Sequence, residues 1–365
     1  MSEWQTFCLK DLGKIVGGAT PPTNNPKNYG NKIAWITPKD LSTLQGRYIK
    51  KGNRSISRLG FKSCSCVLLP KHAILFSSRA PIGYVAIAKK RLCTNQGFKS
   101  IIPNKKIYFE FLYYLLKYHK DNISNIGGGT TFKEVSGATL GLFEVKIPPT
   151  YYEQQKIART LSVLDQKIEN NHKINELLHT LAYKIYEYYF KYKPKNAKLE
   201  QIIIENPKSS IMVKNAQKTQ DKYPFFTSGD NILSYPKSII DGRNCFLNTG
   251  GNAGIKFYVG KASYSTDTWC ICANEFSDYL YLLLSSIKNH INQSFFQGTS
   301  LKHLQKNLLK KYPIYMPSAH EIKKFNQIMM PLLTLISINT RTSKKLEQIR
   351  DFLLPLLLTQ QVKPK

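Results

Sequence analysis

Short apolar runs and longer helical stripes alternate along the chain and divide it into four parts. Residues up to about 147, and again from about 197 to 316, contain strand-sized runs rich in β-branched and aromatic residues, broken by Gly, Pro and Asn. Examples are KIAWITP, AILFSS and YVAIA in the first stretch, and NCFLNT, IKFYVG and WCICA in the second. Such runs predict strands, so each stretch is expected to form a sheet-rich α/β or α+β domain.

A helical stripe follows each of these stretches, because apolar residues recur at alternating steps of four and three. The stripe positions are Ile157, Leu161, Leu164, Ile168, Leu178, Leu181 and Ile185 in the first helix, and Phe325, Met329, Leu332, Ile336, Leu346, Ile349 and Leu353 in the second. This spacing predicts a coiled-coil seam. Each helix is expected to run roughly 40 residues, or about 60 Å.

An asparagine interrupts each stripe at the same point, Asn171 in the first helix and Asn339 in the second. A buried asparagine in an apolar seam lowers stability but fixes the register of pairing. The alternative is that both are exposed and merely polar. Helices this long and amphipathic need a partner, and the expected partner of each is the other, packed antiparallel.

The chain also repeats itself. FEFLYYLLKYHKDNISNIGGGTT at 109–131 matches SDYLYLLLSSIKNHINQSFFQGT at 277–299, and SSRAPIGYVAIA at 77–88 matches NTGGNAGIKFYV at 248–259. Over this span the copies are offset by about 168 to 172 residues, but near the front CLKDLGKIVGG matches AKLEQIIIENP at an offset of about 190. The first copy is therefore predicted to carry about twenty extra residues before its SSRAPIG segment.

Charge gives the first indication of a partner. Lys and Arg number 53 against 23 Asp and Glu, a net charge of +30, with an isoelectric point near 9.7. Such a surplus repels itself unless an anionic partner neutralises it, and nucleic acid is the first candidate, before an acidic membrane surface. A lysine-rich host proteome stays open as a bland explanation, because lysines outnumber arginines.

The seven cysteines favour a reducing environment. Cys64 with Cys66, and Cys270 with Cys272, have a C-x-C spacing and not the C-x-x-C spacing of zinc sites, which predicts two thiols on one face of a strand. The odd count and the absence of a secretory signal predict a cytoplasmic protein. The longest apolar stretches are too short to span a bilayer.

Catalytic motifs are missing from the sequence. It has no Walker-type phosphate loop, no H-E-x-x-H pair and no Asn/Asp-Pro-Pro-Tyr/Phe segment of adenine methyltransferases. The glycines 127–129 follow a helix, so a flexible turn is expected there and not a nucleotide-binding loop. Glu153 and Lys156 lie in the first turn of a helix, where the acid is expected to cap the helix and not to bind magnesium. We therefore expect no catalytic residue, metal or cofactor on this chain.

Several motifs in order resemble a known family. They are LKDLGKIVGGATP at 9–21, SRAPIG at 78–83, TNQG at 94–97, GTTFKE at 129–134 and the IPPTYYEQQKI segment at 147–157 that opens a long helix. The chain resembles the specificity subunit of Type I restriction–modification enzymes over essentially its whole length. The second copy departs from these motifs, with NTGGNAG, STDT and EIKKF in place of SSRAPIG, TNQG and EQQKI.

The resemblance implies a domain order and a set of partners. Residues 1–149 and 195–318 would be two target-recognition domains, here called the first and second modules, and 150–194 and 319–361 would be two spacer helices. Each module would read one half of a split, asymmetric site on double-stranded DNA. Two methyltransferase subunits, which bind S-adenosylmethionine, and restriction subunits with ATP and Mg would complete the complex.

DNA contacts are expected from basic and amide side chains on loops of the two modules. In the first module the candidates are Lys39, Arg47, Arg54, Arg58, Arg79, Asn95, Gln96 and Lys133. In the second they are Arg243, Asn252, Lys256, Thr299 and Lys302. Any of them can instead be an ordinary surface group, and Arg79 can instead lock a strand turn. Two other functions stay open: a fused restriction or modification enzyme with degenerate motifs, and a basic adaptor for RNA or acidic protein.

Overall fold

The computed structural model describes residues 3–129, 133–216 and 222–364. The chain forms two compact units, one of Met1–Glu169 with Leu346–Lys365 and the other of Asn170–Lys345. Each unit contains one strand-rich module together with part of each of two long helices, α6 (Tyr151–Tyr186) and α10 (Ala319–Leu358). The predicted mixed helix-and-sheet class and the internal repeat are confirmed.

The first module is built on a five-stranded sheet with the order β2-β9-β6-β7-β4. Its strands are β2 (Gly13–Gly17), β4 (Tyr48–Ile49), β6 (Ile74–Ser78), β7 (Ile82–Ala88) and β9 (Lys99–Pro103). The central strand β6 is buried along its whole length. Helix α4 (Phe109–Asn125) joins the same core, where Phe111 and Leu112 are fully buried with Phe76 and Ile87 of the sheet.

Smaller elements complete the first module. A three-stranded sheet has the order β5-β3-β8, and β1 pairs with β10. These strands are β1 (Gln5–Cys8), β3 (Tyr29–Ile36), β5 (Arg54–Ile56), β8 (Cys93–Thr94) and β10 (Glu144–Ile147). The short helices are α1 (Leu9–Leu12), α2 (Pro38–Ser42), α3 (Arg58–Lys62) and α5 (Gly137–Gly141).

The second module repeats this arrangement with a four-stranded sheet of order β12-β18-β15-β16. Its strands are β12 (Ile204–Glu205), β15 (Arg243–Asn248), β16 (Ile255–Val259) and β18 (Thr268–Cys272), with β13 (Tyr223–Phe226), β14 (Leu233–Tyr235) and β17 (Ser263–Tyr264) in a three-stranded sheet. Further pairs are β11 (Ala197–Lys198) with β21 (Pro313–Ile314) and β19 (Phe296–Gln297) with β20 (His303–Leu304). The helices are α7 (Ser277–Ser286), α8 (Lys288–Ser294) and α9 (Lys306–Lys310).

The extra residues of the first module lie in one place. Between β3 and β6 the first module has residues 37–73, whereas between β13 and β15 the second has only 227–242. The longer segment carries α2, β4, β5 and α3. Strand β4 pairs in parallel with β7 and is therefore the fifth strand of the first sheet, which the second sheet lacks.

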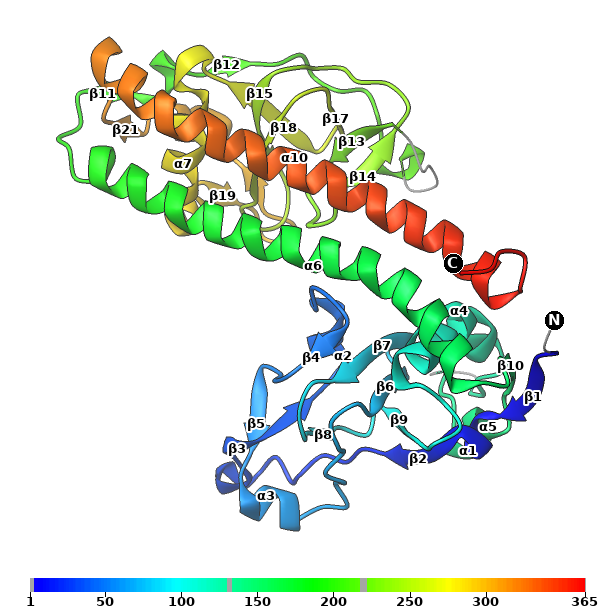
Figure 1. The fold of residues 1–365 in the computed structure, drawn as a ribbon. Coiled ribbons are helices and arrows are strands. Elements are labelled where there is room, and N and C mark those ends of the chain that lie inside the picture. The colour runs from blue at the N-terminus through cyan, green and yellow to red at the C-terminus, as the bar shows by residue number, and fades with distance from the viewer. Residues whose placement is uncertain (1–2, 130–132, 217–221, 365) are drawn as a thin grey trace. The chain divides into compact units, whose positions relative to one another are not determined.

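The two long helices pack antiparallel in each unit (Figure 1). In the first unit Asp165 of α6 binds Arg350 of α10 at 2.7 Å, and in the second unit Phe190, just after α6, packs edge-on against Phe325 of α10 at 4.9 Å between ring centroids. Position 165 lies in the first half of α6 and position 350 in the last quarter of α10. Position 190 follows the end of α6, and its partner 325 lies near the start of α10. The antiparallel pairing predicted from the stripes is confirmed.

The apolar stripes are wider than a two-helix seam. Buried stripe positions are Ile157, Leu161, Ile168, Phe325, Met329 and Ile336, and half-buried ones are Leu164, Leu178, Leu332 and Leu346. The prediction was wrong for Leu181 and Ile349, which are 48% and 47% exposed. Their place is taken by Ala182, Tyr186, Leu354 and Leu357, which are buried in the module cores. Each helix therefore packs on a module as well as on its partner, and this needs a broader apolar face.

Both interrupting asparagines bond across the helix pair. Asn171 donates to Ser343 at 3.2 Å, and Asn339 donates to the side chain of Asn175 at 2.9 Å. Asn171 and Asn339 are 168 positions apart, and so are Asn175 and Ser343. The repeat therefore relates the bond Asn171–Ser343 to the bond Asn339–Asn175. Both asparagines are half-buried, so they form a polar layer of the helix pair and are not free surface groups.

The two cysteine pairs differ. Cys270 and Cys272 lie in β18 as the spacing predicts, but Cys64 and Cys66 follow α3 in an irregular segment, so the strand prediction was wrong there. Cys66 is held by packing against Trp35 and Cys93 in a small core. Among the described residues, no helix is long and apolar enough to cross a membrane.

Candidate nucleic-acid interface

The loops of the first module bring five predicted DNA contacts together around Gly97. The carbonyl of Gly97 accepts a bond from the Ser78 amide at 2.8 Å, and Ser78 accepts one from the Val135 amide at 3.0 Å. A Cβ on Gly97 would lie 2.9 Å from Pro38, the first residue of α2. Arg79, Lys133, Lys39 and the pair Asn95–Gln96 are each within two residues of these contacts, so one loop cluster presents all of them.

Charge and exposure differ within this cluster. Lys39, Gln96 and Lys133 are exposed and Asn95 is half-buried, with its side-chain oxygen accepting from the Gly97 amide at 3.0 Å. The side chain of Arg79 is 37% exposed and pairs with Glu134 at 3.4 Å, and Glu134 also holds Lys99 at 3.1 Å. Arg79 therefore does stabilise the turn, yet part of its guanidinium still faces solvent. The GTTFKE motif is only partly visible here, because 130–132 lie outside the described residues.

Arg54 and Arg58 form a second basic group on the other sheet of the first module. Arg54 lies in β5 with its guanidinium 5.8 Å from the ring centre of Tyr29, and Arg58 is the first residue of α3. Both side chains are exposed. The strand β14 of the second module pairs with β13 as β5 pairs with β3, but β14 contains no basic residue.

The second module assembles a matching loop cluster. The Gly251 amide donates to the Lys302 carbonyl at 2.9 Å, and the Leu304 amide donates to the Thr249 carbonyl at 3.0 Å. This repeats the contact of Ser78 with Val135 in the first module. Exposed Asn252, Thr299 and Lys302 lie on these two segments, so the fold brings three of the predicted contacts together.

Three predicted DNA contacts instead have structural roles. Arg47 is only 3% exposed and binds Glu110 and Glu169, each at 3.1 Å. Arg243 is 17% exposed and paired with Asp278. Lys256 donates to the Thr227 carbonyl at 2.8 Å and to Asn248 at 3.1 Å. These placements were not predicted, because a sequence displays a charge but not the buried acceptor that the fold brings to it.

The carboxylates around Arg47 were missed by sequence reasoning. Asp165, 5% exposed, accepts from the Tyr114 hydroxyl at 2.6 Å and from Arg350 at 2.7 Å. Burial would lower the pKa of Arg47, but the carboxylates of Glu169 and Glu110 outweigh burial and keep it raised. Burial, followed by the charge of Asp165, raises the pKa of Tyr114, so that hydroxyl stays protonated. Acidic residues are scarce in this chain, and their clustering on α4 and α6 was the available signal.

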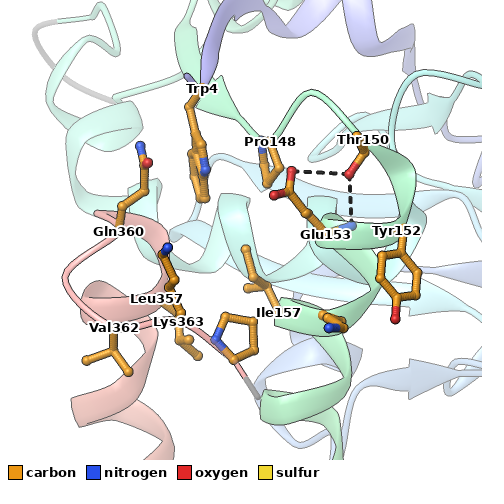
Figure 2. Close-up of a pocket in the computed structure, with 12 residues that line it drawn as sticks. Trp4, Pro148, Thr150, Tyr152, Glu153, Ile157, Leu357, Gln360, Val362 and Lys363 are labelled. Atoms are coloured by element: carbon orange, nitrogen blue, oxygen red, sulfur yellow. Dashed lines mark hydrogen bonds between the residues drawn. The ribbon is translucent and has the colours of Figure 1, made fainter. Parts of the chain in front are cut away.

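A pocket of about 410 Å³ lies at the start of α6 (Figure 2). Trp4, Pro148 and Ile157 face it from the first module and α6, and Leu357, Gln360 and Val362 face it from the end of α10. Thr150 and Glu153 beside it cap α6, with the Glu153 amide donating to the Thr150 hydroxyl at 3.2 Å. No predicted DNA contact lines this pocket. Within the described ranges, no group of three or more His, Cys, Asp or Glu is arranged to hold a metal ion.

Comparison with known proteins places this architecture in a class of paired DNA-specificity modules. The family model described as the type I restriction modification DNA specificity domain matches twice, over residues 1–180 and 195–348. The specificity subunit of the type I restriction enzyme MjaIX from Methanocaldococcus jannaschii is 33% identical over 403 aligned positions, covering 98% of this chain and 93% of that protein.

Two further comparisons agree. The HindI specificity subunit from Haemophilus influenzae is 31% identical over 177 positions, which cover 46% of this chain and 37% of that protein. The crystal structure of the S subunit of a Type-I restriction-modification system from M. genitalium has the same fold, with a TM-score of 0.64, 18% identity and coverage of 97% and 96% of the two chains. The chain belongs to the family of type I restriction–modification specificity subunits.

Proposed function

We propose that the chain is the non-catalytic recognition subunit of a Type I restriction–modification complex and reads a split, asymmetric site on double-stranded DNA. The observation that carries this is the double family match, because each matched range contains one complete module. The loop clusters around Gly97 and Gly251 supply amide, hydroxyl and basic groups, the chemistry that reads base edges and phosphates. The net charge of +30 suits a polyanion.

The two half-sites should differ in sequence. The first cluster offers Arg79, Asn95 and Gln96, whereas the second offers Asn252, Thr299 and Lys302. Arginine favours guanine, and asparagine or glutamine favours adenine, so these sets select different bases. The basic pair Arg54 and Arg58 adds to the first module only, because the strand that matches β5, β14, carries no basic residue.

The long helices would act as a ruler for the gap between the half-sites. Support comes from the 36 residues of α6 and the 40 residues of α10, and from the polar layer that fixes their register. Inserting four residues next to Asn171 should lengthen the recognised gap or abolish recognition. Thermal unfolding of the modules should be unchanged, and a variant that keeps the wild-type gap would contradict the ruler.

The catalytic cofactors would belong to partner subunits. In this proposal two methyltransferase subunits bind S-adenosylmethionine, and the restriction subunits bind ATP and Mg. This chain would scaffold them in the cytoplasm and contribute no reacting group.

The proposal is tested with and without these partners. The purified chain should neither methylate nor cleave DNA in the presence of S-adenosylmethionine and Mg; activity in either assay would favour a fused enzyme. Mixed with its methyltransferase subunits, it should prefer one split duplex over random duplex at matched salt. Equal affinity for all duplexes would instead favour a basic adaptor.

A further inference from the structure

Each module is fastened to a long helix at two points, and these points match between the copies. The first point is an acid in the module's own helix, Glu110 of α4 or Asp278 of α7, which binds an arginine. The second is a residue of the long helix, Glu169 or Ser337, which accepts a main-chain amide of the module. Both the acids and the helix residues are offset by 168 positions, so the repeat preserves both points.

In the first module Arg47 makes both contacts. Its Nη1 binds Glu110 at 3.1 Å, and its Nε and main-chain amide bind the same Glu169 oxygen at 3.1 and 2.9 Å. The preceding Gly46 has φ of +113°, and a Cβ there would lie 2.9 Å from Glu169. This turn is therefore pressed against α6 and tolerates no side chain.

In the second module the two contacts are divided between residues. Arg243 binds both oxygens of Asp278, and its Nη1 and Nη2 reach the Thr334 hydroxyl and the Met330 carbonyl of α10 at 2.9 and 3.2 Å. The Val259 amide donates to Ser337 at 3.0 Å. The guanidinium thus links α7 directly to the long helix, as Arg47 links α4 to α6.

The two arginines do not occupy matching positions. Arg47 lies in the extra segment of the first module, just before β4, whereas Arg243 opens β15. The residue 171 positions before Arg243 is His72, which stacks on Phe109 at 3.9 Å between ring centroids. The same link is therefore made with a basic group from a different strand. A buried ion pair adds little net stability, but separating its members leaves a charge unpaired, so the pair opposes movement of the two segments that it joins.

We propose that Arg47 and Arg243 are positioning residues that orient each DNA-reading module on its long helix and thereby set how strictly the gap between half-sites is read. This rests on the proposed function above. Both guanidinium groups are already paired with acids of the fold, so in this proposal neither acts on the identity of the bases. A module that is free to rock on its helix tolerates a half-site displaced by one base pair, but its loop cluster still selects the same bases.

The test uses the chain in complex with its methyltransferase subunits. Binding is measured on duplexes with the preferred gap, with the gap one base pair longer or shorter, and with single base changes in each half-site. Arg47→Met and Arg243→Met should each reduce the preference for the correct gap about tenfold. The penalty for a wrong base should stay within about twofold of wild type.

Milder variants guard against misfolding. Thr334→Val removes only the hydroxyl that receives Arg243, and Glu169→Gln keeps an oxygen for the Arg47 amide but removes the charge. Both should move gap preference in the same direction by a smaller factor. Arg159→Ala removes an exposed positive charge from α6, so it should lower all affinities equally and leave the preference for gap unchanged.

The outcomes separate the two proposals. If the wild-type complex shows no sequence preference, the proposed function fails. If the wild type is selective but the arginine variants weaken all duplexes by one factor, or change base preference and not gap preference, the positioning role is wrong. A loss of gap preference confined to the arginine, Thr334 and Glu169 variants supports it.

Discussion

The two modules share a sheet order but join the long helices through different chemistry. In the first module, the contact region between the module and the long helices, here called the junction, is ionic and phenolic. Asp165 binds Arg350 and accepts a bond from the Tyr114 hydroxyl, close to the buried Arg47. In the second, the residue 168 positions after Asp165 is Leu333, which is 1% exposed. The surrounding junction is aromatic there, with Phe190, Phe325 and Tyr279 in edge contact.

This difference shows which parts of the repeat are free to change. The cap of each long helix, the acid on the module helix and the main-chain contact to the long helix are kept in both copies. The loop cluster, the extra segment and the side chains that fill the junction differ. The two copies therefore differ more in their DNA-reading loops and in the side chains that fill the junction than in the contacts that hold each module to its long helix.

The largest expected effect comes from giving the first junction the residue of the second. Asp165→Leu removes the buried partner of Arg350 and Tyr114 and leaves Arg350 with only the exposed Asp351, which should cost about 3 kcal/mol of unfolding free energy. Denaturant unfolding followed by fluorescence measures it. Leu333→Met, a volume-conserving control in the second junction, should cost less than about 1.5 kcal/mol. Similar losses of unfolding free energy for both variants would show that the ionic contacts of the first junction contribute no more to stability than the apolar contacts of the second.

The helix caps should respond alike in the two copies. Ser318 accepts from the Glu321 amide at 3.3 Å, as Thr150 does from Glu153 at 3.2 Å. Thr150→Ala and Ser318→Ala should each cost about 0.5–2 kcal/mol in denaturant unfolding. Ser318→Thr keeps the acceptor and should cost far less. A clear difference between the two alanine variants would break the equivalence of the caps.

The polar layer offers a smaller and more selective change. Asn175→Ser makes this position identical to its counterpart Ser343 and shortens the acceptor that Asn339 uses. Losing that bond should cost about 0.5–1.5 kcal/mol. Asn170→Ser, at an exposed neighbouring position, is the control and should have almost no effect. If both variants unfold at the same denaturant concentration, the cross-helix bond contributes nothing measurable.

The smallest expected effect depends on pH. Burial lowers the pKa of His119 in the first module, and the residue 168 positions on is the non-titrating Ile287. Since the unfolded histidine binds a proton more readily, stability is full above about pH 6.5 and falls as the pH drops towards the lower folded pKa. His119→Ile should remove this part of the acid-side decline in melting temperature. A parallel decline in wild type and variant would exclude a contribution from His119.

Much of the architecture could be predicted because it follows from the periodic spacing of apolar residues along short stretches of the chain. The strand-sized runs and the two long helices depend on residues close in sequence, and the offset of the copies follows from comparing segments of the sequence directly. The seam was wrong at Leu181 and Ile349 because a stripe shows that a face is apolar, but not how many neighbours it must cover.

The candidate site was harder to predict. Arg79, Asn95 and Lys133 do come together on one loop cluster, because main-chain bonds join Ser78 to Gly97 and to Val135. Arg47 and Arg243 were predicted to contact DNA although the first is buried and the second is held by Asp278, because their partners lie 63 and 35 residues away. Pairing over such distances depends on tertiary packing, which composition and spacing do not encode.

The mismatch between Arg47 and Arg243 separates what the two copies share from what they do not. Glu110 and Asp278 occupy matching positions 168 residues apart, whereas the arginines that they bind lie at positions that do not match. The repeat thus fixes where the acid lies on the module helix and leaves open which part of the sheet supplies the arginine.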